Sequence, residues 1–339
     1  MKLSAGKYKG LQAVSDSRGV IAALAIDQRS ALKNMIAKSK GIETSAIPNE
    51  LLEQFKVAVS RVLTPHASSI LLDPEYGLPA SKSRAKNAGL LLAYEQTGYD
   101  KNIPGRLPRL LDHFSVRRLV EAGADCIKIL LYYSPFSSAE VNDLKSAWVE
   151  RIGGECKAAD VPYFLELVGY ADGMDEKSAE YAKVKPEVVT SGIQEFSKPH
   201  YAVDVLKVGV PVAMAYVEGV AGAHSEKIYT REEAKKHFKN ASDAAKLPFI
   251  YLSEGVSNET FNDALQIAAE AGSNFCGVLC GRATWKNGVD IFVKQGMDGL
   301  NAWLADEGVR NIENVNKQLK AAKSWFTAYD APASGAVSR

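Results

Sequence analysis

Val20-Ile21-Ala22-Ala23-Leu24-Ala25-Ile26 is an apolar, β-prone run that passes directly into the polar residues Asp27-Gln28-Arg29-Ser30. An open, doubly wound sheet usually carries a glycine-rich phosphate loop after its first strand. Neither GxGxxG nor GxxxxGKS/T occurs here or elsewhere in the chain. The first run therefore favours a closed barrel, and the doubly wound sheet remains the alternative fold.

Eight such runs recur along the chain, and most are separated by roughly 25 to 45 residues, the size of a βα unit. The runs are Val20–Ile26, Ser69–Leu72, Gly89–Tyr94, Cys126–Tyr132, Pro162–Val168, Val203–Val208, Pro248–Leu252 and Phe275–Cys280. Eight strand–helix units predict an α/β fold, a single-domain (β/α)8 TIM barrel over residues 1–330. Residues 331–339 are expected to form a disordered tail.

The segments between the runs have helical periodicity. After the seventh run, Ser257 is expected to cap a helix that carries Phe261 and Leu265 on one face and ends at Gly272. The interval between the second and third runs is short, so only a stub of helix is expected there.

The composition argues against nucleic-acid-binding, membrane and metal-binding classes of protein. The 339 residues include 41 basic and 40 acidic side chains, a net charge of +1, so we expect no nucleic acid or anionic membrane as a partner. The N-terminus lacks an apolar signal region and no apolar stretch is long enough to span a bilayer, so a cytoplasmic protein is expected. Four cysteines without a CxxC motif, and five histidines without a zinc-type cluster, imply free thiols, no metal and no cofactor.

Three consecutive runs carry charged residues in their interiors. Lys128, Glu166 and Lys207 lie in the fourth, fifth and sixth runs, about one βα unit apart. In a barrel of this kind the C-terminal strand ends meet at one mouth, where chemistry occurs. The alternative is a buried structural charge network, but two lysines with one glutamate form a poor one after desolvation.

These residues have a coherent chemistry. Lys128 beside Lys207 should lower the pKa of whichever amine is less well paired, and a neutral Lys207 can attack a ketone to form an imine. Glu166 can shuttle the protons that this reaction needs. Asp27, at the end of the first run, can hold Lys207 or a substrate hydroxyl, and it can also cap the helix that follows.

A phosphate site is expected at the last two strands. Arg282 follows Gly281 just beyond the eighth run, and loops after strands seven and eight often bind phosphate in such barrels. Backbone N–H groups at Gly255 and Gly281 can approach an oxyanion closely. A surface arginine beside a turn glycine is the alternative. The expected phosphate and substrate ligands are Gln28, Arg29, Ser253, Gly255, Gly281 and Arg282, with Arg106 and Arg29 as candidates for a second phosphate.

Longer motifs in the chain resemble those of the class I tagatose-1,6-bisphosphate aldolase family, and the similarity extends from about residue 15 to about residue 315. The similar stretches are Ala25–Arg29, Ser68–Gly77, Leu92–Glu95, Ala122–Asp125 leading to Lys128, Phe164–Leu167, Asp204–Val208, Ala215–Gly219 and Gly277–Trp285. The resemblance implies a metal-independent aldolase that cleaves a phosphorylated ketose, tagatose 1,6-bisphosphate, into dihydroxyacetone phosphate and glyceraldehyde 3-phosphate. It also implies a homo-oligomer, a dimer or a tetramer.

Carried over by position, Lys207 matches the Schiff-base lysine of the family and Glu166 its general acid/base. Asp27 and Lys128 match the supporting polar pair, and Arg282 matches a phosphate ligand.

One departure keeps alternatives open. The family reads Ser-Ala-Gly after strand seven, whereas this chain has Ser253-Glu254-Gly255. A glutamate pointing into a phosphate site would repel the dianion. Either Glu254 points outward, or the substrate is another ketose 1-phosphate, such as 6-deoxy-6-sulfofructose 1-phosphate. Fructose 1,6-bisphosphate, which differs from tagatose 1,6-bisphosphate only in the configuration at C4, is a further candidate substrate. A non-catalytic sugar-phosphate sensor is a third alternative. It is disfavoured because all four expected catalytic residues are present, namely Asp27, Lys128, Glu166 and Lys207.

Overall fold

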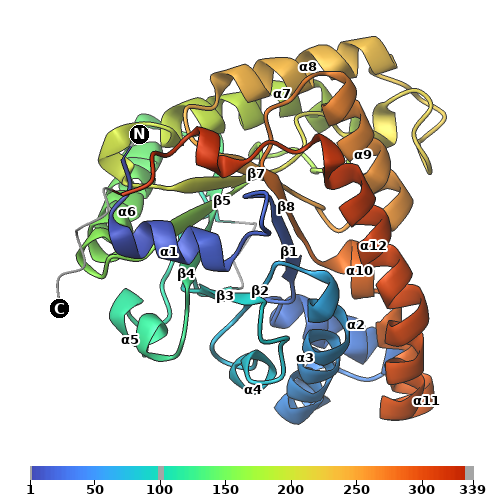
Figure 1. The fold of residues 1–339 in the computed structure, drawn as a ribbon. Coiled ribbons are helices and arrows are strands. Elements are labelled where there is room, and N and C mark those ends of the chain that lie inside the picture. The colour runs from blue at the N-terminus through green and yellow to red at the C-terminus, as the bar shows by residue number, and fades with distance from the viewer. Residues whose placement is uncertain (1, 98–102, 333–339) are drawn as a thin grey trace.

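Eight parallel strands close into a barrel in the order of the sequence, with β1 paired to both β2 and β8 (Figure 1). The computed structural model describes residues 2–97 and 103–332. The strands are β1 (Ile21–Ala25), β2 (Ser69–Leu72), β3 (Gly89–Ala93), β4 (Cys126–Tyr133), β5 (Tyr163–Gly169), β6 (Val205–Val208), β7 (Phe249–Leu252) and β8 (Gly277–Cys280). The predicted single-domain (β/α)8 barrel is confirmed.

Helices surround the barrel. They are α1 (Ala5–Ala13), α2 (Ser30–Lys40), α3 (Asn49–Leu63), α4 (Leu78–Ser81), α5 (Val116–Glu121), α6 (Ala139–Ala158), α7 (Ala179–Phe196), α8 (Arg231–Ala244), α9 (Asn258–Glu270), α10 (Arg282–Trp285), α11 (Gly288–Trp303) and α12 (Val309–Gln318). The four-residue α4 is the expected stub. No helix in the described part of the chain is both long and apolar enough to cross a membrane.

Strand β6 begins two residues later than predicted. Asp204 lies just before it, and its carboxylate accepts hydrogen bonds from Lys7 Nζ (2.7 Å) and from the Tyr163 amide (2.8 Å). A side chain therefore takes over part of the pairing at this end of the barrel. The predicted 331–339 tail is described only at its first two residues, and the rest of it lies outside the described residues.

The barrel interior explains why charged residues gather at one end. Side chains alternate between the inside and the outside of a strand. A buried inner cluster includes Ala25, Ala93, Cys126, Phe164 and Val205. In each of these strands, the residue two positions further on is charged, and these residues are Asp27, Glu95, Lys128, Glu166 and Lys207. The period of two thus places the charges in the next inward-facing layer, at the C-terminal mouth.

The opposite end of the barrel is closed by both ends of the described chain. Helix α1 and the segment after α12 lie side by side across it (Figure 1). The rings of Tyr8 and Trp325 meet at 5.1 Å, and Trp325 is buried in the same cluster as the inner strand residues. With this end covered, the C-terminal mouth is the open end of the barrel.

Candidate active site

Lys128 is at the centre of the charged layer. Its Nζ lies 2.9 Å from Asp27 Oδ2, 2.7 Å from Glu95 Oε1 and 2.8 Å from Glu166 Oε2. Burial alone would lower the pKa of Lys128, but the charges of Asp27, Glu166 and Glu95 outweigh it and raise this pKa well above its ordinary value. Lys128 is therefore a fixed ammonium rather than a nucleophile.

Lys207 is the less well paired of the two amines. Its Nζ lies 2.8 Å from Glu166 Oε2, and Glu166 is the one carboxylate within ion-pair distance of it among the described residues. Glu166 and Lys207 are direct neighbours in the β5–β6 pairing, so the sheet itself fixes their contact. Lys207 is 4% exposed, which leaves its amine at the floor of the mouth. The predicted meeting of Lys128, Glu166 and Lys207 is thus found.

Glu166 Oε2 lies between the two lysine amines. Burial would raise the pKa of Glu166, but Lys128 and Lys207 together lower it. The pKa of Asp27 is likewise lowered, because Lys128 and Lys207 outweigh the effect of burial. Both groups are therefore carboxylates at neutral pH, and Glu166 is placed to accept a proton from Lys207.

Asp27 pairs with Lys128, as the resemblance implied, but it neither contacts Lys207 nor caps the next helix. Its carboxylate contacts Lys128 rather than Lys207, and its Oδ1 accepts a hydrogen bond from Gln28 Nε2 at 3.1 Å. It does not cap the helix that follows, because the N-cap residue of α2 is Arg29 and no side chain caps that helix. The backbone around Asp27 is held instead by buried Lys56 Nζ, which donates to the carbonyls of Ile26 (2.7 Å) and Gln28 (2.9 Å) and pairs with Asp73.

Glu95 belongs to the site although sequence reasoning did not include it. It is 1% exposed, and its Oε2 has no hydrogen-bond partner among the described residues. Burial raises the pKa of Glu95, although Lys128 and Arg29 act in the opposite direction. The available signal was that Glu95 directly follows the third apolar run. It was a weaker signal than that of Lys128 and Lys207, because those residues lie inside their runs and Glu95 lies just outside.

Strands β7 and β8 bring two of the expected phosphate ligands, Gly255 and Arg282, together. The Val256 amide donates to the Ser253 carbonyl at 3.1 Å, and this closes a turn over residues 253–256. The Arg282 guanidinium lies against Gly255 so closely that a Cβ there would be 2.6 Å from Arg282 Cζ. Arg282 forms no ion pair with any described residue. This half-buried cation beside a bare backbone is suited to an oxyanion.

Glu254 does not point at Arg282. Its Oε2 pairs with Lys185 Nζ on helix α7 at 2.6 Å. The first of the two alternatives for this residue, that its side chain turns away from the phosphate ligands, therefore agrees with the geometry.

The candidates for a second phosphate are held by acidic groups. Arg29 lies 2.6 Å from Glu75 and donates to the Glu95 carbonyl at 2.7 Å. Arg106 lies 2.6 Å from Glu176. Either arginine would have to exchange a carboxylate for the phosphate. Gln28 is different, since its buried Oε1 has no partner among the described residues and can accept from a substrate hydroxyl.

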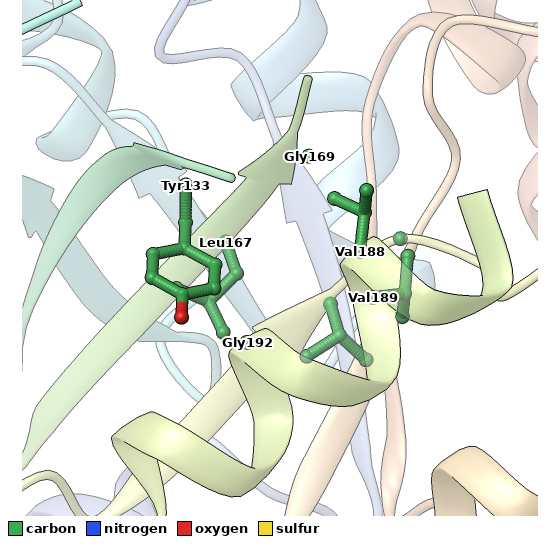
Figure 2. Close-up of a pocket in the computed structure, with 8 residues that line it drawn as sticks. Tyr133, Leu167, Gly169, Val188, Val189 and Gly192 are labelled. Carbon is green, nitrogen blue, oxygen red and sulfur yellow. The ribbon is translucent and has the colours of Figure 1, made fainter. Parts of the chain in front are cut away.

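A small cavity lies outside the mouth, between helix α7 and strands β4 to β6 (Figure 2). It is lined by Tyr133, Leu167, Gly169, Val188, Val189, Gly192, Val208 and Gly209, and its volume is about 10 Å³. This is roughly the room of a single water. The cavity is therefore a packing gap under α7 and no substrate site.

Residues 21–287 match the family model described as DeoC/LacD family aldolase. A tagatose 1,6-diphosphate aldolase 2 of Enterococcus faecalis is 55% identical over 327 residues, which cover 96% of this chain and 97% of that protein. A tagatose 1,6-diphosphate aldolase of Listeria monocytogenes is 50% identical over 331 residues, 97% of this chain and 96% of that protein. One from Staphylococcus aureus is 52% identical and covers 96% and 99%.

Solved structures agree on the fold. A fructose-bisphosphate aldolase from Plasmodium falciparum superposes with a TM-score of 0.61 at 16% identity, covering 98% of both chains. An archaeal fructose-1,6-bisphosphate aldolase whose catalytic lysine carries the carbinolamine intermediate has a TM-score of 0.51 at 16% identity, covering 86% of this chain and 98% of that one. Both have the barrel described here.

Proposed function

The chain belongs to the DeoC/LacD family of aldolases, and on this premise we propose that it is a carbon–carbon lyase that cleaves tagatose 1,6-bisphosphate through an imine on Lys207. The observation that carries the proposal is the pair Lys207–Glu166 at 2.8 Å, with Lys128 on the other side of the same carboxylate oxygen. A nucleophilic amine, a proton acceptor in contact with it and a fixed cation are the parts that imine formation needs.

Imine formation begins with proton transfer from Lys207 to Glu166. The amine then attacks the C2 carbonyl of the ketose and forms a carbinolamine. Glu166 returns a proton to the C2 hydroxyl, which leaves as water, and a cationic imine remains. Lys128 stays protonated throughout, because its pKa is raised well above its ordinary value by Asp27, Glu166 and Glu95 despite burial. It can therefore stabilise the carbinolamine oxygen without exchanging a proton.

Cleavage follows when a base removes the proton of the C4 hydroxyl. The C3–C4 bond breaks, its electrons pass to the imine as an enamine, and glyceraldehyde 3-phosphate is released. Protonation at C3 and hydrolysis of the imine give dihydroxyacetone phosphate and free Lys207. Glu166 is the base in this proposal, and Gln28 Oε1 and Asp27 orient the hydroxyls of the sugar.

The phosphate next to the ketone is assigned to the turn of Ser253 and Gly255 together with Gly281 and Arg282. The unpaired guanidinium supports this assignment, since Arg282 has no carboxylate neighbour to displace among the described residues. Arg29 is proposed for the distal phosphate, reached by exchange with Glu75. A cytoplasmic location, a homo-oligomeric state, and the absence of a metal, cofactor or nucleic-acid partner are further expectations.

The test is borohydride reduction of the protein with dihydroxyacetone phosphate in the presence of a chelator, followed by peptide mass mapping. We expect one stable adduct, on Lys207. An adduct on another lysine, or none although the phosphate binds, would contradict the proposal and favour a sugar-phosphate sensor.

Two substitutions test the roles of the pair. Lys207→Ala should lower kcat by a factor of more than about a thousand, because it removes covalent catalysis. Glu166→Gln should slow kcat by on the order of 10² while substrate affinity stays largely intact. Single-turnover cleavage assays measure both, and an active Lys207→Ala enzyme would refute the imine.

Relative rates on tagatose 1,6-bisphosphate, fructose 1,6-bisphosphate and 6-deoxy-6-sulfofructose 1-phosphate identify the natural substrate. We expect the first to be cleaved at least as fast as the others, in keeping with the names of the relatives at 50–55% identity.

A further inference from the structure

The turn beside Arg282 has an unusual backbone. Its two central residues both have positive φ, +50° at Glu254 and +76° at Gly255. Such turns favour glycine, asparagine or aspartate at both positions, because a Cβ is crowded there. Gly255 meets this demand and Glu254 does not. Some other contact must hold Glu254 in place.

Lys185 supplies this contact. It is 7% exposed on helix α7, and its Nζ lies 2.6 Å from Glu254 Oε2. The same Nζ donates to the Val212 carbonyl at 3.4 Å, in the segment that follows β6. One buried cation thus ties the turn after β7 to the loop after the strand of Lys207.

The carboxylate of Glu254 also fits against the backbone of that loop. Its Oε1 occupies the space that a Cβ on Gly209 would need, two residues after Lys207. Ion pair and close packing together direct the Glu254 side chain toward α7 and β6. The turn is left to present its backbone to Arg282, whose guanidinium lies against Gly255.

We infer that Lys185 and Glu254 are positioning residues for substrate phosphate: their ion pair holds the 253–256 turn in its positive-φ form and keeps the Glu254 carboxylate away from the anion. The inference rests on the proposed function, since it assigns a phosphate to this turn. Without Lys185 the carboxylate would be released beside the anion that Arg282 binds, and like charges at short range disfavour binding.

A set of variants separates anchoring, backbone strain and charge. Glu254→Gly loses the ion pair but accepts φ of +50° freely, whereas Glu254→Ala loses the pair and keeps the crowded Cβ. Lys185→Met leaves the carboxylate without a partner. The double variant Lys185→Met/Glu254→Gly removes both members. Ala202→Gly is the matched control, because Ala202 also has a positive φ (+52°) but precedes β6, at the closed end of the barrel.

Calorimetry then gives Kd for dihydroxyacetone phosphate and for inorganic phosphate. We expect Lys185→Met to weaken both by about ten-fold, Glu254→Gly by two- to three-fold, and Glu254→Ala by more than Glu254→Gly. The double variant should bind no worse than Glu254→Gly, so that the two changes are strongly non-additive. The control should stay within two-fold of the wild type.

The inference is overturned if Lys185→Met and Glu254→Gly both keep Kd within two-fold, or if their effects simply add. Should Lys185→Met fail to fold, the comparison of Glu254→Gly with Glu254→Ala at an exposed position still decides. Borohydride trapping on wild-type Lys207 reports separately on the proposed function. Failure of trapping with intact phosphate coupling would refute imine chemistry and leave the positioning role standing.

Discussion

Five charged side chains share the inner layer at the mouth, and the neighbours of each one determine its charge state and its possible role. Lys128 has three carboxylate neighbours and Lys207 has one. Asp27 and Glu166 are held as carboxylates by the lysines, with lowered pKa values, whereas burial raises the pKa of Glu95. Only one amine in the layer is therefore placed to act as a nucleophile.

Glu95 and Asp27 should respond differently to amidation. Burial raises the pKa of Glu95, so its charge is held less firmly than that of Asp27, and glutamine in its place can still accept from Lys128 through its amide oxygen. We expect Glu95→Gln to keep kcat within about three-fold, and Asp27→Asn, which removes an ionised partner of Lys128, to lower kcat by on the order of 10². Steady-state kinetics checks both, and equal losses would contradict the division of charge.

Lys145 gives a stability prediction of known sign. It is fully buried, its Nζ lies 2.9 Å from the Tyr170 hydroxyl, and burial lowers its pKa to about 8 although Asp172 acts in the opposite direction. Between pH 8 and the ordinary lysine value of 10.5 the unfolded chain binds a proton that the folded chain does not. Stability contributed at this site therefore rises with pH across that window.

Lys145→Met removes the titration. The free energy of unfolding of the wild type, measured by urea denaturation relative to this variant, should increase between pH 8 and pH 10.5 and be flat from pH 6 to 7. A constant difference across the whole range would show that Lys145 keeps its proton in the folded protein.

Helix α9 shows how an element fixes a neighbouring turn. The Ser257 side chain accepts from the Thr260 amide, and the helix begins directly after the 253–256 turn. The cap, the apolar face and the stop at Gly272 follow from local sequence alone. They were predicted because each depends on residues within one or two helical turns of one another.

Loss of this cap should be felt locally. Ser257→Ala leaves the Thr260 amide without its acceptor and should destabilise the first turn of α9 by about 1 kcal/mol, whereas Ser257→Asp should keep the cap. Hydrogen exchange of the amides of residues 259–261 should accelerate several-fold in the alanine variant only. Unchanged exchange would mean that tertiary packing, rather than the cap, holds this end of the helix.

Other parts of the site depend on contacts between distant elements and were missed. Lys185 is one of many lysines on helices, and nothing near it in the sequence indicates a partner on the turn after β7. The positive φ of Glu254 is likewise hidden, because the motif Ser-Glu-Gly gives no backbone angle. The sequence indicated that Glu254 is unusual beside the expected phosphate ligands, and only the fold showed that Lys185 pairs with it.

For the molecule as a whole, the fold could be predicted from two repeating patterns in the sequence. One is the alternation of side chains along a strand, and the other is the repeat of strand–helix units. The period of two along each strand predicted which side chains face inward. The eightfold recurrence of strand–helix units predicted that the sheet closes into a barrel. The same periods placed Lys128, Glu166 and Lys207 together. They did not give the pairing of Asp27 with Lys128 instead of Lys207, because that choice depends on side-chain reach across the barrel.

The pairing of β1 with β8 has a consequence for synthesis in the cell. Strand β1 ends at Ala25, and its second partner begins only at Gly277, about 250 residues later. At translation rates of about 5 to 20 residues per second, β1 waits on the order of ten to fifty seconds with an unpaired hydrogen-bonding edge. Such an edge is a template for wrong pairing. The order of synthesis therefore leaves one edge of β1 open to wrong pairing until β8 has been made.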